Sequence, residues 1–436
     1  MALLKIKNLG PIKNGYSQNN GFMEIKPVTV ICGNQATGKS TIAKVYSSLA
    51  WLEKKLDAGE LSKPNTKSFL VELLAYHRID SYLTKETEIE YQGNSCNISY
   101  SNSKLKVTEL KDSKYIRPKI VYIPAERNFC TSIPNATYLN GLARETFGFL
   151  SDYMIAANSL NKNRYKLPLN GYEFRYDKKT NTSYISDQKT DYEIDITCAS
   201  SGLQSISPMA LTSAYYSQLI SDNSDNQEFS FEQKKRWEEG MSKIANQYKV
   251  PDISVKSLNE ALAKYRNNVQ DAAYTFETEQ DKKIYEYLIR IINSRFINVV
   301  EEPEQNLYPN SQSEILFYLL QCFNNQSYNT TEKIENQLLI TTHSPYILSY
   351  LTLSAKAAEL LRDKRVPAAK IENIIPVKAT VDGDKVAIYQ TKSDGTIELL
   401  EPYENLPSDD NELNKILAES NDKFSDLLDL EVKFCR

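Results

Sequence analysis

The sequence predicts an α/β fold, with a central sheet of parallel or mixed strands, a helical subdomain and a small C-terminal α+β region. Three apolar runs, 120–123, 296–300 and 338–342, are rich in β-branched residues and have the composition of buried strands. Polar residues follow each run directly, and stretches with helical spacing lie between them. Because the carboxyl ends of parallel strands meet at one edge of a sheet, we expect these polar residues to lie close together.

A fourth apolar run, 28–32, leads into a loop that fits the pattern G-x-x-x-x-G-K-[ST]. Apolar residues at helical spacing follow from Ile42 to Leu56, so the loop should join a buried strand to a helix. In such a loop the backbone N–H groups and the helix N-terminus face a phosphate chain. We expect Lys39 to contact the β- and γ-phosphates and the Ser40 hydroxyl to bind Mg²⁺. The expected ligands are ATP and Mg²⁺, and the predicted nucleotide-binding residues are Gly33, Asn34, Gln35, Ala36, Thr37, Gly38, Lys39, Ser40 and Thr41.

Hydrolysis requires, besides a phosphate loop, a carboxylate that activates water and a group that senses the γ-phosphate. Glu302 closely follows the run 296–300 and is the predicted water-activating base, while Glu301 is predicted to hold Mg²⁺ through water. His343 follows the run 338–342 and is the second predicted catalytic residue. A surface acidic turn is the alternative interpretation of the glutamates, and a purely structural histidine is the alternative for His343.

Two further segments are predicted to contact the nucleotide. Arg127 lies just beyond the run 120–123 and is a candidate sensor of the γ-phosphate or of an interface; a surface arginine that caps a strand is the alternative. The segment 200–205 precedes a helical stretch, so its backbone N–H groups are suited to a second anion site. The predicted contacts in this segment are Ser201, Gly202 and Gln204.

The character of the sequence changes near residue 350. Residues 1–350 contain all the segments above and are predicted to form the nucleotide-binding domain, with a helical and insertion part at about 130–293. Residues 351–436 are predicted to be an appended region for oligomerisation or partner binding. After a helix, this region is expected to form strands at 371–377, 384–390 and 396–400.

Composition restricts the class of protein. Lys+Arg 52 against Asp+Glu 56 gives a net charge of −4, so there is no global basic signal for nucleic acid, although direct DNA or RNA binding stays open. No apolar run approaches the roughly 18 residues of a membrane-spanning helix, and the N-terminal segment lacks the apolar core of a signal peptide. The six cysteines are scattered and form no C-x-x-C pair. We therefore expect a reduced, cytoplasmic protein with no membrane partner.

The order of these motifs resembles that of ATP-binding-cassette (ABC) ATPases of the SMC/OLD branch. Residues 33–41 match the Walker A motif of this family, and residues 200–204 resemble its signature motif. Residues 299–309 resemble the Walker B and D-loop run of OLD-like ATPases. Residues 341–348 resemble the switch-histidine segment, and residues 122–128 resemble a short sequence that is also found in this branch. The resemblance therefore extends over about residues 1–350.

The resemblance implies an ABC-ATPase head that works in pairs. Two heads of this family sandwich two ATP molecules, and the signature motif of one chain contacts the γ-phosphate held by the Walker A motif of the other. We therefore expect a homo-oligomer assembled through ATP-sandwiching heads.

The same branch includes many bacterial antiphage proteins. Some of its members carry a TOPRIM nuclease domain after the ATPase, but here residues 382–384 are the only D-x-D of the C-terminal region and fit a turn between strands better. A chain without a nuclease resembles the ATPases of two-gene PARIS or Septu defence systems. The resemblance then implies an oligomeric sensor that holds an effector nuclease, most simply of TOPRIM type, and releases it when a phage trigger protein is sensed.

Two other functions remain open at the level of sequence. A DNA-binding repair ATPase of the RecF or SMC-like type would be favoured by a basic groove, whereas the acidic pI of 5.6 and the lack of long heptad repeats count against it. A transporter ATPase subunit is the third possibility, and the sequence around Glu302 and His343 argues against it.

Overall fold

The structure is a computed structural model. It describes residues 2–110, 115–133, 141–160, 163–190, 192–221, 231–248, 295–325, 334–363, 365–404, 406–407 and 410–434, with a few single positions between 257 and 288.

The central sheet has seven strands in the order β2, β16, β15, β4, β14, β13, β8. Neighbouring strands are parallel from β15 through β4, β14 and β13 to β8, whereas β16 runs antiparallel to β15. A mixed sheet that packs against helices confirms the predicted α/β class. The strands of this sheet are β2 Gly15–Tyr16, β4 Val28–Gly33, β8 Pro118–Ile123, β13 Arg295–Glu301, β14 Gln337–Thr342, β15 Val386–Thr391 and β16 Thr396–Leu399.

A second, antiparallel sheet has five strands in the order β3, β1, β5, β6, β7. The helix α1, Lys39–Asp57, contacts strands of both sheets and shares one hydrophobic core with them. Helix α2, Lys67–Ala75, packs beside α1. The strands are β1 Ala2–Leu9, β3 Met23–Ile25, β5 Leu83–Gln92, β6 Cys96–Ser101 and β7 Lys104–Glu109.

The apolar residues of β4 show why both faces of the central sheet are covered. Val28 and Val30 belong to the core on one face, together with residues of α5, α9 and α10, whereas Ile31 belongs to the core around α1. Alternate residues of a strand point to opposite faces, so a strand with apolar residues at both odd and even positions must be covered on both faces. The helices on the first face are α5 Ser201–Ser221, α9 Pro309–Asn324 and α10 Pro345–Asp363.

The segment 163–196 forms a small antiparallel sheet in the order β12, β11, β10, β9, within the range predicted to hold a helical and insertion part. Helix α4, Arg144–Ser159, packs against α5 and β8 nearby. Most of the predicted helical stretch after Tyr248 lies outside the described residues. The remaining elements here are β9 Tyr165–Lys166, β10 Tyr172–Asp177, β11 Thr182–Asp187, β12 Tyr192–Asp195, α3 Phe129–Ser132 and α6 Phe231–Tyr248.

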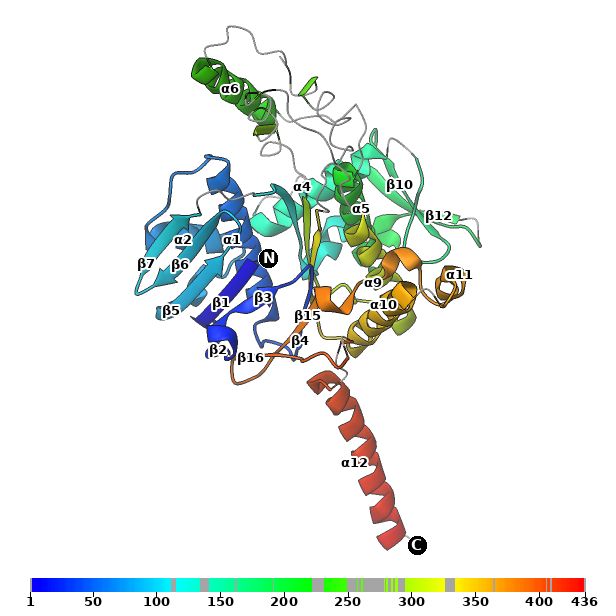
Figure 1. The fold of residues 1–436 in the computed structure, drawn as a ribbon. Helices are drawn as coiled ribbons and strands as arrows, with labels where there is room; N and C mark the ends of the chain where they lie inside the picture. The colour runs from blue at the N-terminus through cyan, green and yellow to red at the C-terminus, as the bar shows by residue number, and fades with distance from the viewer. Residues whose placement is uncertain are drawn as a thin grey trace.

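Near the C-terminus the structure differs from the predicted strands. The predicted strand at 371–377 is wrong, because this segment contains the end of α11, Ala368–Glu372, and a turn that leads to a 3₁₀ helix, Val377–Ala379. The strands β15 and β16 lie in the central sheet, where β15 is directly beside β4 and β16 pairs with the other edge of β15. The domain boundary near residue 350 stays a prediction. Figure 1 shows α12, Glu412–Phe434, extending away from the rest of the fold.

Short 3₁₀ helices connect several of these elements. Within the described residues, no helix is long and apolar enough to span a membrane. The 3₁₀ helices are Asn19–Gly21, Asp80–Tyr82, Ala125–Asn128, Ile196–Cys198, Val377–Ala379 and Gly383–Lys385.

Candidate nucleotide-binding site

The loop between β4 and α1 has the local structure that its sequence predicts. It runs from Gly33, the last residue of β4, to Lys39, the first of α1. Gly38 caps the helix with φ of 102°, a conformation that favours glycine. Among the described residues, the amide groups of residues 34–38 donate to no other backbone carbonyl. These N–H groups are therefore available to an anion at the N-terminus of α1.

Lys39 lies under this loop and is only 4% exposed. Its Nζ donates to the carbonyl oxygens of Gly33 at 3.0 Å and Asn34 at 2.6 Å, and lies 3.3 Å from Nδ1 of His343. Burial lowers the pKa of Lys39 to about 8, although the negative charge of Glu302 opposes the shift. The ammonium group is thus positioned at the loop by neutral partners, which a phosphate could replace.

His343 connects the phosphate loop to the end of β13. Its Nε2 lies 3.1 Å from Oε1 of Glu302, while its Nδ1 faces Lys39 at 3.3 Å. The three residues come from the carboxyl ends of β4, β13 and β14, which are neighbours in the sheet. The predicted meeting of the ends of β13 and β14 is confirmed, whereas the catalytic roles of Glu302 and His343 stay predictions.

Glu302 has an unusual backbone conformation for a residue other than glycine. Its φ is 43°, and its amide donates to the carbonyl oxygen of Thr341 at 2.9 Å. The hydrogen bond from His343 lowers the pKa of Glu302, and this effect exceeds that of burial. Glu302 is therefore a carboxylate at neutral pH, half-buried and able to accept a proton.

Glu301, the last residue of β13, is 3% exposed. One carboxylate oxygen accepts a hydrogen bond from the Tyr122 hydroxyl, and the other accepts from the amide of Ala125 at 3.2 Å. Burial raises the pKa of Glu301, and the charge of Lys44 opposes this shift. Each oxygen keeps a further lone pair, so contact with a metal-bound water fits this geometry.

Ser40 lies in the first turn of α1 and is half-buried. Within the described residues its hydroxyl belongs to no side-chain hydrogen bond, so the hydroxyl is available to a cation beside the loop. No group of three or more His, Cys, Asp or Glu side chains suited to a metal occurs in the described part of the chain. The residues thus fit a Mg²⁺ ion that is held mainly by phosphate and water, with Ser40 and Glu301 as the protein's contribution.

Arg127 is fully buried, at 0% exposure, rather than a surface residue. Its guanidinium donates to the carbonyl oxygens of Glu301 and Glu302, each at 2.7 Å. Two longer bonds of 3.3 Å reach the carbonyls of Pro124 and Ser205. The alternative of a surface strand cap is therefore wrong. A direct contact of Arg127 with phosphate stays a prediction, and in the structure the guanidinium fixes the turn that carries both glutamates.

The segment resembling the signature motif begins α5, as predicted. Ser201 is exposed, whereas a Cβ on Gly202 would lie 2.9 Å from the carbonyl oxygen of Asn306. The Gln204 side chain donates to the carbonyls of Ile196 at 3.1 Å and Thr197 at 3.0 Å. Gln204 thus supports the start of α5 within its own chain, and the contacts of all three residues with nucleotide stay predictions.

Two residues at the site were not found from the sequence. The Thr391 hydroxyl, at the end of β15, lies 2.6 Å from that of Thr37 in the phosphate loop. Tyr122 holds Glu301 through its hydroxyl. A threonine at the end of a short strand and a tyrosine inside an apolar strand carry no local signal of such roles.

The carboxylate of Glu304 holds the backbone at His343 in place. It accepts from the amide of His343 at 2.7 Å and from the Thr342 hydroxyl at 2.7 Å. Burial raises its pKa, against these hydrogen bonds. The acidic cluster after β13 therefore divides into one carboxylate that faces His343 Nε2 and one that fixes the backbone of His343.

Comparisons with known proteins find a weak likeness to solved structures. No protein-family model matches the chain, and no curated protein matches it. A solved structure that is similar to it is the SMC head bound to the C-terminal winged-helix domain of ScpA. The identity is 9%, the match covers 91% of this chain and 95% of that chain, and the TM-score is 0.36. At these values the likeness carries no inference about ligands or partners.

Proposed function

We propose that this chain is an ABC-type ATPase, which binds ATP with Mg²⁺ and hydrolyses it. The observation that carries this proposal is the convergence of Lys39, His343 and Glu302, with 3.3 Å between the first pair and 3.1 Å between the second. A cation, a histidine and a carboxylate at three adjacent strand ends form the set of groups that phosphoryl transfer to water needs. The free amide groups of the loop support binding of the phosphates.

In the proposed reaction, the ammonium of Lys39 exchanges the carbonyls of Gly33 and Asn34 for the β- and γ-phosphates. Glu302 accepts a proton from the attacking water, and His343, which touches both residues, senses the γ-phosphate. Bound Mg²⁺ would neutralise phosphate charge, with Ser40 and Glu301 positioned to hold it. Arg127 holds the backbone of Glu301 and Glu302 in place through hydrogen bonds to their carbonyl oxygens.

The proposed active form is a pair of heads. Ser201 is exposed at the start of α5, and Gly202 packs against the turn after β13. Tyr308, in the segment resembling the D-loop, is 74% exposed and so offers an aromatic side chain to a partner. Both features support a contact with a second copy of this chain, whose nucleotide Ser201, Gly202 and Gln204 would approach.

We further propose, on the resemblance of the motifs, that the ATPase is the sensor and scaffold of an antiphage system. By size and layout the chain resembles AriA of PARIS most, and PtuA of Septu next. The proposed partners are an effector nuclease of TOPRIM type and a phage trigger protein. Native mass spectrometry of the chain expressed with its adjacent gene, with and without ATP, tests this: a multimer that carries a nuclease supports it. A lone dimer that binds DNA on addition of ATP would instead favour a repair ATPase.

The ATPase itself is tested by comparing Lys39→Ala with a matched control, Lys356→Ala, on the exposed side of α10. We expect Lys39→Ala to abolish ATP binding and turnover, and Lys356→Ala to behave as the unmodified chain. Calorimetric titration with a non-hydrolysable ATP analogue measures binding, and phosphate release measures turnover. Undiminished ATP binding by a folded Lys39→Ala variant would refute the proposed site.

A further inference from the structure

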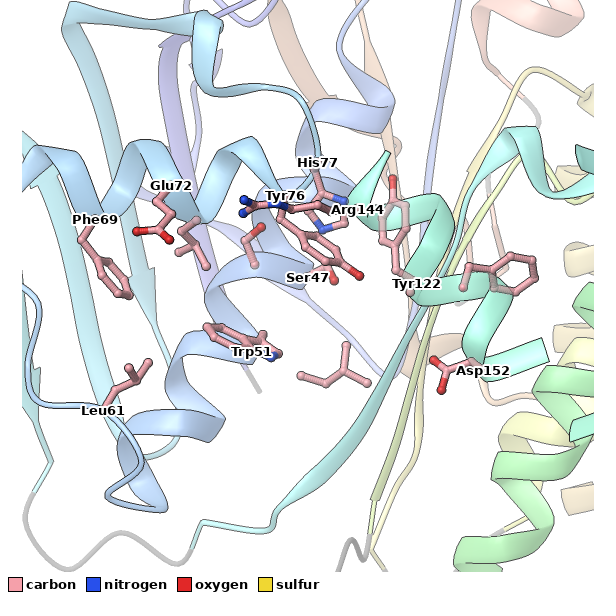
Figure 2. A pocket seen from close by; sticks show the side chains of 15 residues that line it. Ser47, Trp51, Leu61, Phe69, Glu72, Tyr76, His77, Tyr122, Arg144 and Asp152 are labelled. Atoms are coloured by element: carbon pink, nitrogen blue, oxygen red, sulfur yellow. The ribbon is translucent and has the colours of Figure 1, made fainter. Parts of the chain in front are cut away.

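A second cavity lies apart from the phosphate loop, between α1, α2, β8 and α4 (Figure 2). Its volume is about 550 Å³, within the range of pockets that bind small molecules. No residue of the loop 33–41 lines it. It does include Tyr122, whose hydroxyl bonds to Glu301, so the cavity borders the predicted nucleotide site without sharing its phosphate contacts.

The wall of this cavity is largely aromatic. Trp51 and Tyr76 line this wall and are 41% and 38% exposed to solvent. Phe69 and Phe149 extend the same wall. Aromatic side chains prefer to stack on, or meet edge-on, another ring. An aromatic ligand would therefore cover apolar surface that the chain itself leaves in contact with water.

The charged residues of the cavity fall into two groups. Asp152 is neutralised, because Lys119 lies 2.8 Å from it and the Tyr216 hydroxyl donates to it at 2.5 Å. In contrast, Glu72 and Arg144 make no ion pair with any described residue. Figure 2 shows these two side chains on one side of the cavity, with the indole of Trp51 across from them.

We propose that this cavity binds a small aromatic zwitterion, a molecule of the aromatic amino acid class. The ring would pack on Trp51, the carboxylate would bind Arg144, and the ammonium group would bind Glu72. Hydrogen bonds between such charged partners are the strong ones, and both protein groups are otherwise unbalanced. An aromatic anion would pair with Arg144 alone, and an aromatic cation would pair with Glu72 alone. In either case the other charged side chain would stay without an ion pair.

Three probes distinguish these possibilities on the full chain. L-Phenylalanine carries both charges, 3-phenylpropionate lacks the amine, and phenethylamine lacks the carboxylate. Titration calorimetry measures affinity, and tryptophan emission reports the place of binding. Trp51 is one of two tryptophans, and the other, Trp237, is 1% exposed. We expect L-phenylalanine to saturate one site per chain, to change the emission of Trp51, and to bind about tenfold more tightly than either analogue.

Substitutions assign each charge. In Arg144→Gln, L-phenylalanine and phenethylamine should bind equally, whereas in Glu72→Gln, L-phenylalanine and 3-phenylpropionate should bind equally. Arg365→Gln, which changes an arginine on the surface near Asp363, should alter nothing. All these positions are exposed, so the variants should fold as the unmodified chain does.

Two results would overturn the proposal: no saturable binding of L-phenylalanine, or binding that neither Arg144→Gln nor Glu72→Gln changes. Lys39→Ala separates this site from the nucleotide site. It should lose ATP binding and keep L-phenylalanine binding, whereas a joint loss in a folded variant would place L-phenylalanine at the phosphate loop and refute the second site.

Discussion

The Nε2 atom of His343 lies 3.1 Å from a carboxylate oxygen of Glu302. This hydrogen bond lowers the pKa of Glu302 and fixes the side chain at the edge of the sheet where three strands end. The contact thus connects the ionisation of the proposed base to the residue that would sense the γ-phosphate.

Glu302→Gln should bind ATP and fail to hydrolyse it. Glutamine keeps the size and a hydrogen-bond acceptor for His343 but cannot take a proton from water. We expect turnover to fall by a factor of about 10² to 10⁴, with the ATP-bound pair of heads accumulating. Phosphate release and light scattering after size exclusion measure the two effects. Glu86→Gln, an exposed residue of β5, is the matched control, and wild-type turnover by Glu302→Gln would show that another group is the base.

Arg127→Lys should lower both stability and turnover. A lysine cannot donate at once to the four carbonyl oxygens that the buried guanidinium contacts, so some of them lose their partner. We expect the free energy of unfolding to fall by about 3 kcal/mol, measured by chemical denaturation. Arg365→Lys, on the surface, should be neutral. If Arg127→Lys changed ATP affinity alone, with unaltered stability, Arg127 would act on phosphate directly.

Thr391→Val, a substitution outside the phosphate loop, should weaken ATP binding. It removes the hydroxyl that lies 2.6 Å from that of Thr37 and 3.2 Å from the carbonyl oxygen of Cys32. We expect a loss of about 1 kcal/mol in stability, and a several-fold weaker affinity for a non-hydrolysable ATP analogue. Thr380→Val, whose hydroxyl bonds only locally, is the control for a lost hydroxyl. Equal affinities in the two variants would contradict a role of β15 at the site.

Affinity for ATP should fall as the pH rises through about 8. Burial lowers the pKa of Lys39 to about 8, so the free protein loses this cation in that range, where an exposed lysine would keep it. The pH dependence of analogue binding by calorimetry measures this loss. The control Lys356→Ala, which removes an exposed lysine of α10, should lose affinity over the same range as the unmodified chain does. A constant affinity up to about pH 10 in the unmodified chain would show that Lys39 stays charged.

Glu145→Gln should destabilise the fold at neutral pH and remove part of its sensitivity to acid. Burial favours a raised pKa for Glu145, but His77 at 3.0 Å, Lys44 at 3.6 Å and Arg78 at 2.9 Å outweigh it and lower the pKa to about 2. An acid with a lowered folded pKa stabilises the fold above its unfolded pKa of about 4.3, and this stability is lost as the pH falls towards 2.

The expected size of this contribution is about 3 kcal/mol. Denaturation curves between about pH 6 and pH 2 measure it, and Glu145→Gln should be less stable at pH 6 and change less with acid. The exposed pair Lys63 and Glu109 supplies the control, since Glu109→Gln should alter neither quantity. An unchanged acid profile in Glu145→Gln would refute the assignment.

The sequence was sufficient to predict that Lys39, Glu302 and His343 lie close together. Each follows an apolar strand, and parallel strands bring their carboxyl ends to one edge, so local patterns and one rule of topology place the three together. It was also sufficient to predict the strand–loop–helix structure around the phosphate loop, because that motif specifies its own local structure.

Other features depend on the order of strands, which local patterns do not encode. Nothing around Thr391 indicates that β15 lies beside β4, and so its hydroxyl contact with Thr37 was missed. The segment 371–377 has the composition of a strand, but Pro376 removes a backbone donor, and the Glu372 carboxylate accepts from the amide of Val377 at 2.7 Å in a turn. Contacts within the segment therefore outweighed its β-branched composition.

The position of β4 has a consequence for how the chain is made. Both hydrogen-bonding edges of β4 are occupied by strands that come much later, β14 from residue 337 and β15 from residue 386. While the ribosome is still translating, the strand that carries the phosphate loop has no neighbour on either side. The nascent chain must therefore keep these two unpaired edges from pairing with other chains until β15 has emerged. Assembly of the phosphate loop into the central sheet thus has to wait for the synthesis of residues 337–391.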